Sequence, residues 1–441
     1  MQVIRILFFL LWALVVCESA CAQESGAEPV WSLQECVAYA LEHNLQVRKQ
    51  RLGVEGAAAD LKQAKGQFLP DLNASAVSSW SSGTNRGELD GESAYTSSAS
   101  LNTALVLYQG GALRTDLKRT NLALEGAVLS VDQIEDEVVV QVIEQFLNVL
   151  YATENLRYYE QVVAGTEAQV RQAKAFFAAG GKAHREVLDL EAQLAADRYT
   201  ALSASQLLNQ QKSALKQLLE MPVDKVLEFG PLKEAEDASW EKLPSLEEVF
   251  AAALGYRPEL KKQELGLTMA ELDLRSARSA YLPQLALSAG LSSNYSNGND
   301  AGFIQQFSDS YQKGLSLQLK IPLFNRYATQ SVVKRQRLAL QESSLELENT
   351  RNLILQSAER RYEDAEAALA RYHAAVVQEN ATMESYAYAQ EQYRLGMINA
   401  IELLQVRNVW LNAGKEEIQA KYTALLQRRV LQHYIGIWEV D

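Results

Sequence analysis

The chain has 441 residues, of which 48% are hydrophobic and 22% are charged, so its composition is that of a folded protein. The length is enough for two or three ordinary domains. A formal net charge of −13 argues against nucleic acid as a partner.

Residues 1–22 have the features of a secretory signal peptide. Arg5 supplies the positive region, residues 6–16 are apolar, and Ala20-Cys21-Ala22 forms an A-x-A cleavage site. Cys17 and Cys21 also follow the apolar run, which leaves an N-terminal lipid anchor as an alternative. Cleavage after Ala22 would leave Cys36 without a partner, so the mature chain would have no internal disulfide.

No later stretch approaches 18 consecutive apolar residues, and the sequence therefore predicts no transmembrane helix. A membrane-spanning β-strand needs only about 9–11 residues of alternating pattern, so a membrane location stays possible.

The chain is an internal duplication. At a shift of about 213 residues, SLQECVAYAL falls on SLEEVFAAAL, and FLPDL falls on YLPQL. At a shift of about 216 residues, LKRTNLAL falls on VKRQRLAL, and GGKAHREVLDL falls on GMINAIELLQV. We expect two copies of one supersecondary unit, at residues 31–220 and 244–438, with a proline-containing linker at 221–243 between them.

Each repeat opens with a helix start signal and continues to a proline. Ser32 with Glu35, and Ser245 with Glu248, predict capping boxes ahead of a short helix. A longer helix follows and should end before Pro70 or Pro283, because proline disfavours helical geometry in the residue before it.

Two alternating strands are expected after each proline, in hairpins at about 71–108 and 284–324. The second hairpin is the clearer one, with strands at roughly 284–296 and 311–323 around a polar, glycine-rich loop. One side of these strands is apolar and carries Leu285, Leu287, Leu291, Leu315, Leu317 and Leu319. The other side carries small or polar residues such as Ser288 and Ser316.

Long helical regions fill the rest of each repeat, at about 110–219 and 326–436. No proline occurs between residues 71 and 221 or after 323. A helix of some 65 residues would be about 100 Å long, and glycines at 180–181 and 396 should end it before a returning helix. Apolar spacing predicts packed seams at Val138, Val142, Phe146 and Val149, and at Leu188, Leu194, Leu202, Leu208 and Leu215. Taken alone, this composition is typical of a coiled-coil rod.

The number of strands limits what the hairpins can form. Two strands per repeat give four per chain, too few to close a transmembrane barrel, and an open edge in lipid leaves backbone groups unpaired. If the strands span a membrane, the barrel must be shared between chains, and three chains are favoured. The leucine side would then face lipid and the serine side a water-filled lumen. A soluble sheet covering a core would show the same alternation.

With these features together, the sequence resembles the TolC-like outer-membrane efflux proteins from Trp31 to about Trp438. The resemblance rests on the duplicated order of helix, Leu-Pro, hairpin, very long helix, glycine tip and helix. It also rests on PLFNR at 322–326 and YRLGMINAIELLQV at 393–406. The first repeat departs at Tyr108-Gln109-Gly110-Gly111, where glycines stand in place of the proline motif.

The resemblance implies a mainly α-helical fold with a transmembrane β part. A homotrimer would form a 12-stranded β-barrel in the outer membrane and an α-helical tunnel in the periplasm. The protein would be a passive exit duct of a tripartite efflux or secretion system. Its partners would be outer-membrane lipid, a periplasmic adaptor (membrane fusion protein) and an inner-membrane pump of the RND or ABC type.

The resemblance also assigns candidate functional residues. The helix tips should meet the adaptor, and they contain Gly180, Gly181, Lys182, Arg394, Gly396 and Met397. For Lys182 and Arg394, a neighbouring helix is an equal alternative to the adaptor. An acidic ring near the periplasmic mouth would favour cations, and Glu384 and Glu391 are the nearest candidates. Solvated glutamates on a helix surface are the simpler interpretation of both.

No catalytic or cofactor-binding constellation is recognisable in the sequence. His43, His184, His373 and His433 have no metal-ligand spacing, and neither a G-x-S-x-G motif nor a P-loop occurs. We therefore expect no enzyme activity, cofactor or metal. Besides the duct, a periplasmic helical adaptor and a structural coiled-coil protein remain as alternatives. An adaptor would also need a lipoyl-like β domain, and a fibre would not need the duplicated hairpins.

Overall fold

A computed structural model describes residues 30–82, 93–181, 183–222, 228–230 and 242–437. The expected signal peptide, with Cys17 and Cys21, lies outside the described residues. The chain divides into two compact units, each built from both repeats. Of the described residues, unit 1 contains those within 30–45, 135–253 and 357–437, and unit 2 contains those within 46–134 and 254–356. Among the described helices, none is long and apolar enough to cross a membrane.

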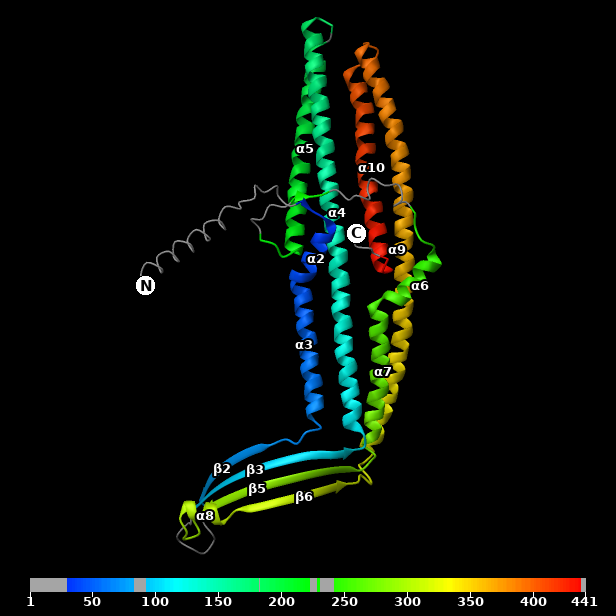
Figure 1. The fold of residues 1–441 in the computed structure, drawn as a ribbon. Coiled ribbons are helices and arrows are strands. Elements are labelled where there is room, and N and C mark those ends of the chain that lie inside the picture. The colour runs from blue at the N-terminus through cyan, green and yellow to red at the C-terminus, as the bar shows by residue number, and fades with distance from the viewer. Residues whose placement is uncertain (1–29, 83–92, 182, 223–227, 231–241, 438–441) are drawn as a thin grey trace, which may run out of the picture. The chain divides into compact units, whose positions relative to one another are not determined.

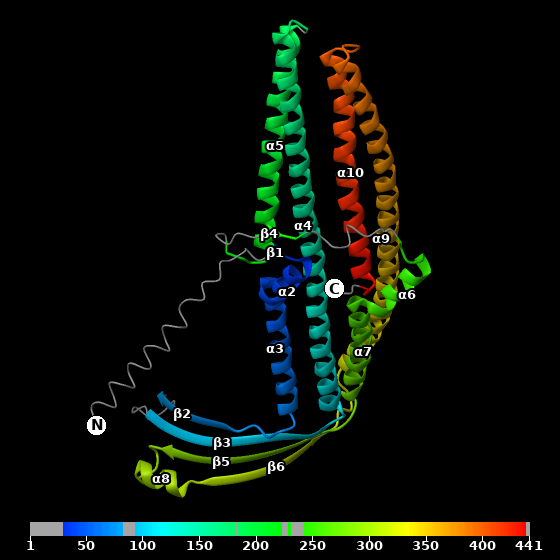
Figure 2. The same ribbon diagram turned by 45° about the horizontal axis from the view of Figure 1, so that its top comes forward.

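Two long helices each contribute to both units. Helix α4 runs from Ala112 to Ala178 and helix α9 from Ala328 to Arg394, and each has 67 residues. The expected proline-free helices are confirmed. In unit 1, α4 is followed by the returning helix α5 (His184–Leu218), and α9 by α10 (Ala400–Tyr434), as Figure 2 shows.

The core of unit 1 confirms one predicted seam and corrects the other. Val138, Val142, Phe146 and Val149 of α4 are all buried. On α5, however, Leu188 and Leu202 are exposed, and the buried face runs through Val187, Leu190, Asp197, Ala204 and Leu215. The α5 prediction is therefore confirmed for Leu215 and wrong for Leu188 and Leu202, because it followed the leucines alone, whereas the buried face includes a charged residue and an alanine.

Unit 1 also contains a short helix and a small sheet. Helix α2 (Leu33–His43) begins at the expected capping box, in which the Glu35 backbone N–H donates to Ser32 Oγ. Cys36 on α2 is buried and free, and burial raises the pKa of its thiol to about 12. Strand β1 (Val30–Trp31) pairs in parallel with β4 (Glu228–Phe229), a contact that the sequence did not predict.

Unit 2 is dominated by one antiparallel sheet. Its strands are β2 (Asn73–Ser82), β3 (Ser93–Gln109), β5 (Gln284–Ser296) and β6 (Gln312–Lys320). They lie side by side in the order β2-β3-β5-β6 (Figure 1), so the central pair joins the two repeats. The expected hairpins are confirmed, with strand ends within a few residues of the prediction.

Helices lead into both hairpins. Helix α3 (Leu45–Gly66) precedes Pro70, and α7 (Pro258–Ser279) follows α6 (Leu246–Tyr256) and precedes Pro283. Both helices end four residues before the proline and finish in a turn. The polar loop between β5 and β6 contains a short helix, α8 (Phe303–Asp309), where only a loop was expected.

The strand-to-helix corners of unit 2 explain why glycines can replace the proline motif in the first repeat. Gly110 and Gly111 have φ values of 60° and 84°, and Arg326 and Tyr327 have φ values of 53° and 61°. Both corners therefore turn through two successive left-handed residues. Glycine adopts this conformation without steric cost, whereas other residues are strained in it.

Candidate functional site

Each helical hairpin of unit 1 turns at a glycine with left-handed geometry. Gly180 and Gly396 both have a φ of 77°. At the first tip, the Gly181 N–H donates to Phe176 O, and at the second the Met397 N–H donates to Gln392 O. These are the long hydrogen bonds of a Schellman motif, which satisfies the last carbonyls of a helix. The predicted glycine tips are confirmed as helix ends.

The other predicted tip residues differ in their surroundings. Lys182 lies outside the described residues. Met397 is 70% exposed, as expected for a residue that could contact a partner. Arg394 forms an ion pair with Glu391 at 2.5 Å, and this pairing lowers the pKa of the Glu391 carboxyl. Glu384 is exposed on α9. The structure therefore brings Arg394 and Glu391 together, although they were predicted to serve different roles.

A hydrogen bond that the sequence did not predict connects the two hairpins near their tips. The Tyr393 hydroxyl donates to Glu186 Oε2 at 3.3 Å. Tyr393 is buried against Tyr386, Ala389, Ala400 and Leu403, and this burial together with Glu186 raises its pKa to about 12. No local sequence pattern indicates this contact, because its two residues lie 207 positions apart in the chain.

A buried ion pair lies deeper between the same hairpins. The Nη2 atom of Arg407 on α10 donates to Asp197 Oδ2 of α5 at 2.5 Å and to Thr166 Oγ1 of α4 at 2.7 Å. The Thr166 hydroxyl in turn donates to the same oxygen, Asp197 Oδ2, at 2.6 Å. Arg407 is only 2% exposed. A buried pair of this kind resists loss of either partner, because the remaining charge would be buried alone.

A cavity of about 380 Å³ borders this ion pair on α4, α9 and α10. Tyr386 and Trp410 stack there with ring centroids 4.9 Å apart, and Gln169 donates to the Tyr386 hydroxyl at 2.6 Å. Further along, the Tyr422 hydroxyl donates to Glu154 at 2.7 Å. Burial raises the pKa of the nearby Glu417 carboxyl. Polar side chains thus connect α10 to α4 at several levels of unit 1.

The sheet of unit 2 separates two kinds of side chain. The register pairs Leu285 with Leu319, Leu287 with Leu317, and Ala289 with Leu315. The same face continues onto β3, where Leu101 pairs with Leu291 and Leu105 with Leu287. All six predicted leucines therefore share one face, and Leu315, Leu317 and Leu319 are exposed on it. The lipid-facing role of these residues stays a prediction.

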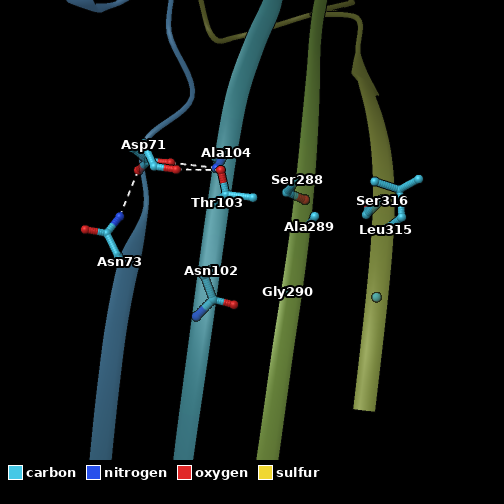
Figure 3. A pocket seen from close by; sticks show the side chains of 11 residues that line it. Asp71, Asn73, Asn102, Thr103, Ala104, Ser288, Ala289, Gly290, Leu315 and Ser316 are labelled. Carbon is cyan, nitrogen blue, oxygen red and sulfur yellow. Dashed lines mark hydrogen bonds between the residues drawn. The ribbon is translucent and has the colours of Figure 1, made fainter.

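The opposite face is small and polar. Ser288 pairs with Ser316 and Gly290 with Gly314, and Ser75 and Ser100 exchange a hydrogen bond at 2.8 Å. Figure 3 shows the hollow near this point, where Asn102 reaches toward Gly290. A Cβ atom added to Gly290 would lie 2.9 Å from Asn102 Oδ1, so the glycine makes room for the amide.

Asp71 fixes the start of the first hairpin. Its carboxylate accepts from the Ala104 backbone N–H at 2.6 Å and from Asn73 Nδ2 at 2.9 Å, as Figure 3 shows. Its backbone carbonyl accepts from the Thr103 hydroxyl at 2.5 Å. Asp71 follows Pro70 directly, so these bonds set the register of β2 on β3 where the chain leaves the helical segment.

Exposed aromatic residues gather at both ends of the sheet. Near the helices these are Phe68, Tyr108, Tyr281, Phe324 and Tyr327. At the far ends of the strands they are Trp80, Tyr95, Phe303 and Tyr311. The sequence did not predict this grouping, although the positions of these residues at the strand ends were recognisable in it. Among the described residues, no group of three or more potential ligands could hold a metal ion.

Comparison with known proteins identifies the class. The sequence profile of the family described as outer membrane efflux protein matches residues 37–220 and 249–437. The chain is 24% identical to protein CyaE of Bordetella pertussis, over 91% of this chain and 82% of that protein. It is 22% identical to outer membrane protein TolC of Escherichia coli strain K12, over 89% and 80%. The crystal structure of the outer membrane protein VceC from Vibrio cholerae superposes with a TM-score of 0.75, at 16% identity, over 92% of this chain and 96% of that one.

The chain therefore belongs to the outer membrane efflux protein family, and its fold is that of the TolC-like channels. As a member of this family it is an outer-membrane exit duct of an efflux system. The two alternatives from the sequence, a periplasmic adaptor and a structural coiled-coil protein, are set aside by this match. The related proteins are channels rather than enzymes.

Proposed function

We propose that three copies of this chain close a 12-stranded β-barrel in the outer membrane and join their helices into a periplasmic tunnel. The observation that carries the proposal is the two-faced sheet. Its order, β2-β3-β5-β6, leaves β2 and β6 as edges, each paired on one side within the described chain. An open edge in lipid would leave backbone groups unpaired, and pairing β6 of one copy with β2 of the next removes it.

Two further features support a membrane position for the sheet. Its leucine face suits lipid, and its serine and glycine face suits a water-filled lumen. The aromatic residues at both strand ends match the girdles that flank the apolar band of outer-membrane barrels. The expected signal peptide accounts for export, and an N-terminal lipid anchor would add a second membrane attachment.

In this proposal, the duct conducts passively while other proteins supply energy. The hairpin tips at Gly180–Gly181 and Gly396 would form the periplasmic mouth and contact an adaptor through exposed residues such as Met397. An inner-membrane pump of the RND or ABC type would drive transport through that adaptor. The repeats at 31–220 and 244–438 would each supply one hairpin and one pair of long helices.

We keep an acidic ring at the mouth as part of the proposal. Glu391 is paired with Arg394, so its charge is partly balanced. Glu384 is exposed and better placed to act on passing ions. Three copies of Glu384 would favour cations over anions. Glu384→Gln should lower the cation preference in planar bilayers, and an unchanged preference would remove Glu384 from the gate.

Fractionation and gel migration test the assembly. We expect the protein in the outer-membrane fraction, extracted by detergent, and migrating as a trimer unless the sample is heated. A monomer in the soluble periplasmic fraction would contradict the proposal.

A matched pair of substitutions tests the sheet faces. Leu317→Arg should place a charge in lipid and destabilise the barrel by about 2–4 kcal/mol near the bilayer midplane. Ser316→Arg, one residue away on the other face, should keep its charge in water and leave the trimer yield close to wild type. Equal yields of heat-modifiable trimer from the two variants would show that the faces are misassigned.

A further inference from the structure

We propose that helix α8 is an interfacial anchor, which rests on the lipid–water boundary at the end of the sheet away from α7. This inference depends on the proposed membrane position of the sheet and adds a lipid contact outside the strands. Its basis is the way α8 is fixed to β5 and what it presents to the surroundings.

Buried polar contacts hold α8 firmly. Gln306 accepts from the Ser296 backbone N–H at 3.0 Å, and its amide donates to the carbonyls of Ser296 at 3.1 Å and Ala301 at 2.6 Å. The Ser293 hydroxyl donates to Phe307 O at 2.6 Å. These bonds join two residues of the helix to the last residues of β5, so α8 has a defined orientation on the strand.

The helix is attached on the apolar face of the sheet. Ser293 and Tyr295 alternate in step with Leu287 and Leu291, so they share the leucine face. Tyr295 contacts the Phe303 ring at a centroid distance of 5.0 Å, and Phe303 contacts Phe307 at 5.0 Å. The apolar surface of the strands therefore continues onto α8, where Ile304 is 83% exposed.

The distance along β5 places α8 at a boundary. From Leu285 to Tyr295 the strand advances about 33 Å, at about 3.3 Å per residue. With the tilt of about 40° that is usual in such barrels, this corresponds to about 25 Å across the membrane, the height of an outer-membrane apolar band.

A charged residue lies on β6 toward the same end of the sheet, four residues short of the level of Tyr295. Lys313 pairs with Leu291 on the leucine face, and its ammonium lies 4.9 Å from the centre of the Tyr311 ring. A lysine on this face suits the boundary, where its head reaches water while its stem remains on apolar surface. The exposed aromatic and aliphatic side chains near this end of the sheet, such as Tyr311 and Ile304, fit the region of lipid headgroups.

Spin labels can measure the depth of α8 directly. Single cysteines would be placed at Ile304, at Leu317 on the leucine face, at Ser316 on the polar face and at Asn299 in the loop, in a Cys36→Ala background. The labelled protein, checked for trimer migration, would be reconstituted into phosphatidylcholine vesicles. Collision rates with oxygen, which enters lipid, and with a nickel chelate, which stays in water, report the depth of each label.

If α8 is an interfacial anchor, the four labelled positions should differ in their collision ratios in a defined order. The ratio of oxygen to nickel collisions should be highest at Leu317, intermediate at Ile304, and several-fold lower at Asn299 and Ser316. If Leu317 resembles Ser316, the proposed membrane position fails as a whole. If Leu317 contacts lipid while Ile304 resembles Asn299, the duct stands and the anchor is wrong. A label at Ile304 shielded from both reagents would show that protein covers α8, which also contradicts the anchor.

Discussion

The two repeats have the same backbone at equivalent positions and different side chains. The corners after the first and second hairpins both use two left-handed residues, Gly110-Gly111 in one and Arg326-Tyr327 in the other. The glycine at each helical tip has the same φ of 77°. Divergence after duplication has therefore preserved the turns, which set the path of the chain, while the residues around them changed.

The helix starts after the tips show the opposite case, where equivalent residues have different partners. In the second repeat, Asn399 caps α10, accepting from the Glu402 backbone N–H at 3.0 Å and donating to its side chain at 3.0 Å. In the first repeat, Ala183 occupies that position and provides no side-chain cap. Glu186, the equivalent of Glu402, accepts a hydrogen bond from Tyr393 in the other hairpin.

In the buried ion pair, too, equivalent positions of the two repeats have different partners. At the 216-residue shift, Arg407 aligns with Glu191 and Asp197 aligns with Ala413. Arg407 and Asp197 are buried together, whereas Glu191 forms an exposed ion pair with Lys174 at 2.6 Å. One member of the buried pair comes from each repeat, and neither repeat carries the same residue at the position equivalent to its partner's member.

Asp197→Ala breaks this difference, because it gives the first repeat the residue that the second repeat has at the equivalent position. Arg407 would then stay buried without a carboxylate, and we expect a loss of about 3–5 kcal/mol in the free energy of unfolding. The urea midpoint of the detergent-solubilised protein measures the change.

Glu191→Ala is the matched control for this prediction. It removes the exposed carboxylate that pairs with Lys174 and should cost less than about 1 kcal/mol. Similar midpoints for Asp197→Ala and Glu191→Ala would show that the Arg407 pair is no more important than a surface contact.

Gly110→Ala tests the shared corner. A Cβ atom at this position would lie 2.5 Å from the Ser279 carbonyl oxygen, and the backbone has a positive φ. Left-handed strain and overpacking together should cost about 2–4 kcal/mol. Gly111→Ala has no atom within 4 Å of the new Cβ and should show the strain alone, about 1–2 kcal/mol. Trimer yield and urea midpoint compare the two, and equal losses would exclude the Ser279 contact as a cause.

Much of the fold was predictable because it is encoded locally. The capping boxes, the prolines before the strands and the glycines at the tips each act within a few residues of their position. The strand faces follow from a two-residue period that one residue of slip would reverse. These signals were enough to place β5 at its observed bounds and to predict two very long helices that each end at a glycine.

The contacts between hairpins were not predictable in this way. Asp197 and Arg407 are charged residues on buried helix faces, and apolar spacing excludes such positions from a predicted core. The two residues lie more than 200 positions apart in the chain, so local patterns carry no information about their contact. Helix α8 was missed for another reason, since FIQQFSD is short and sits within a loop rich in glycine and asparagine.

Tyr393→Phe gives the smallest expected effect and tests what replaced the cap in the first repeat. It removes the hydrogen bond to Glu186 and should cost about 1 kcal/mol in the free energy of unfolding near neutral pH.

The raised pKa of Tyr393 sets the pH range over which this hydrogen bond contributes to stability. Because the protonated phenol is favoured in the folded protein, its contribution is complete below about pH 10 and is lost as the pH rises through about 12. The variant should also lack one late-titrating phenol in the difference absorbance against wild type. Tyr388→Phe, at an exposed position on the same helix, should leave the unfolding midpoint unchanged. If the two variants behave alike, the Tyr393–Glu186 bond does not connect the hairpins in solution, and the repeats differ at their tips in capping alone.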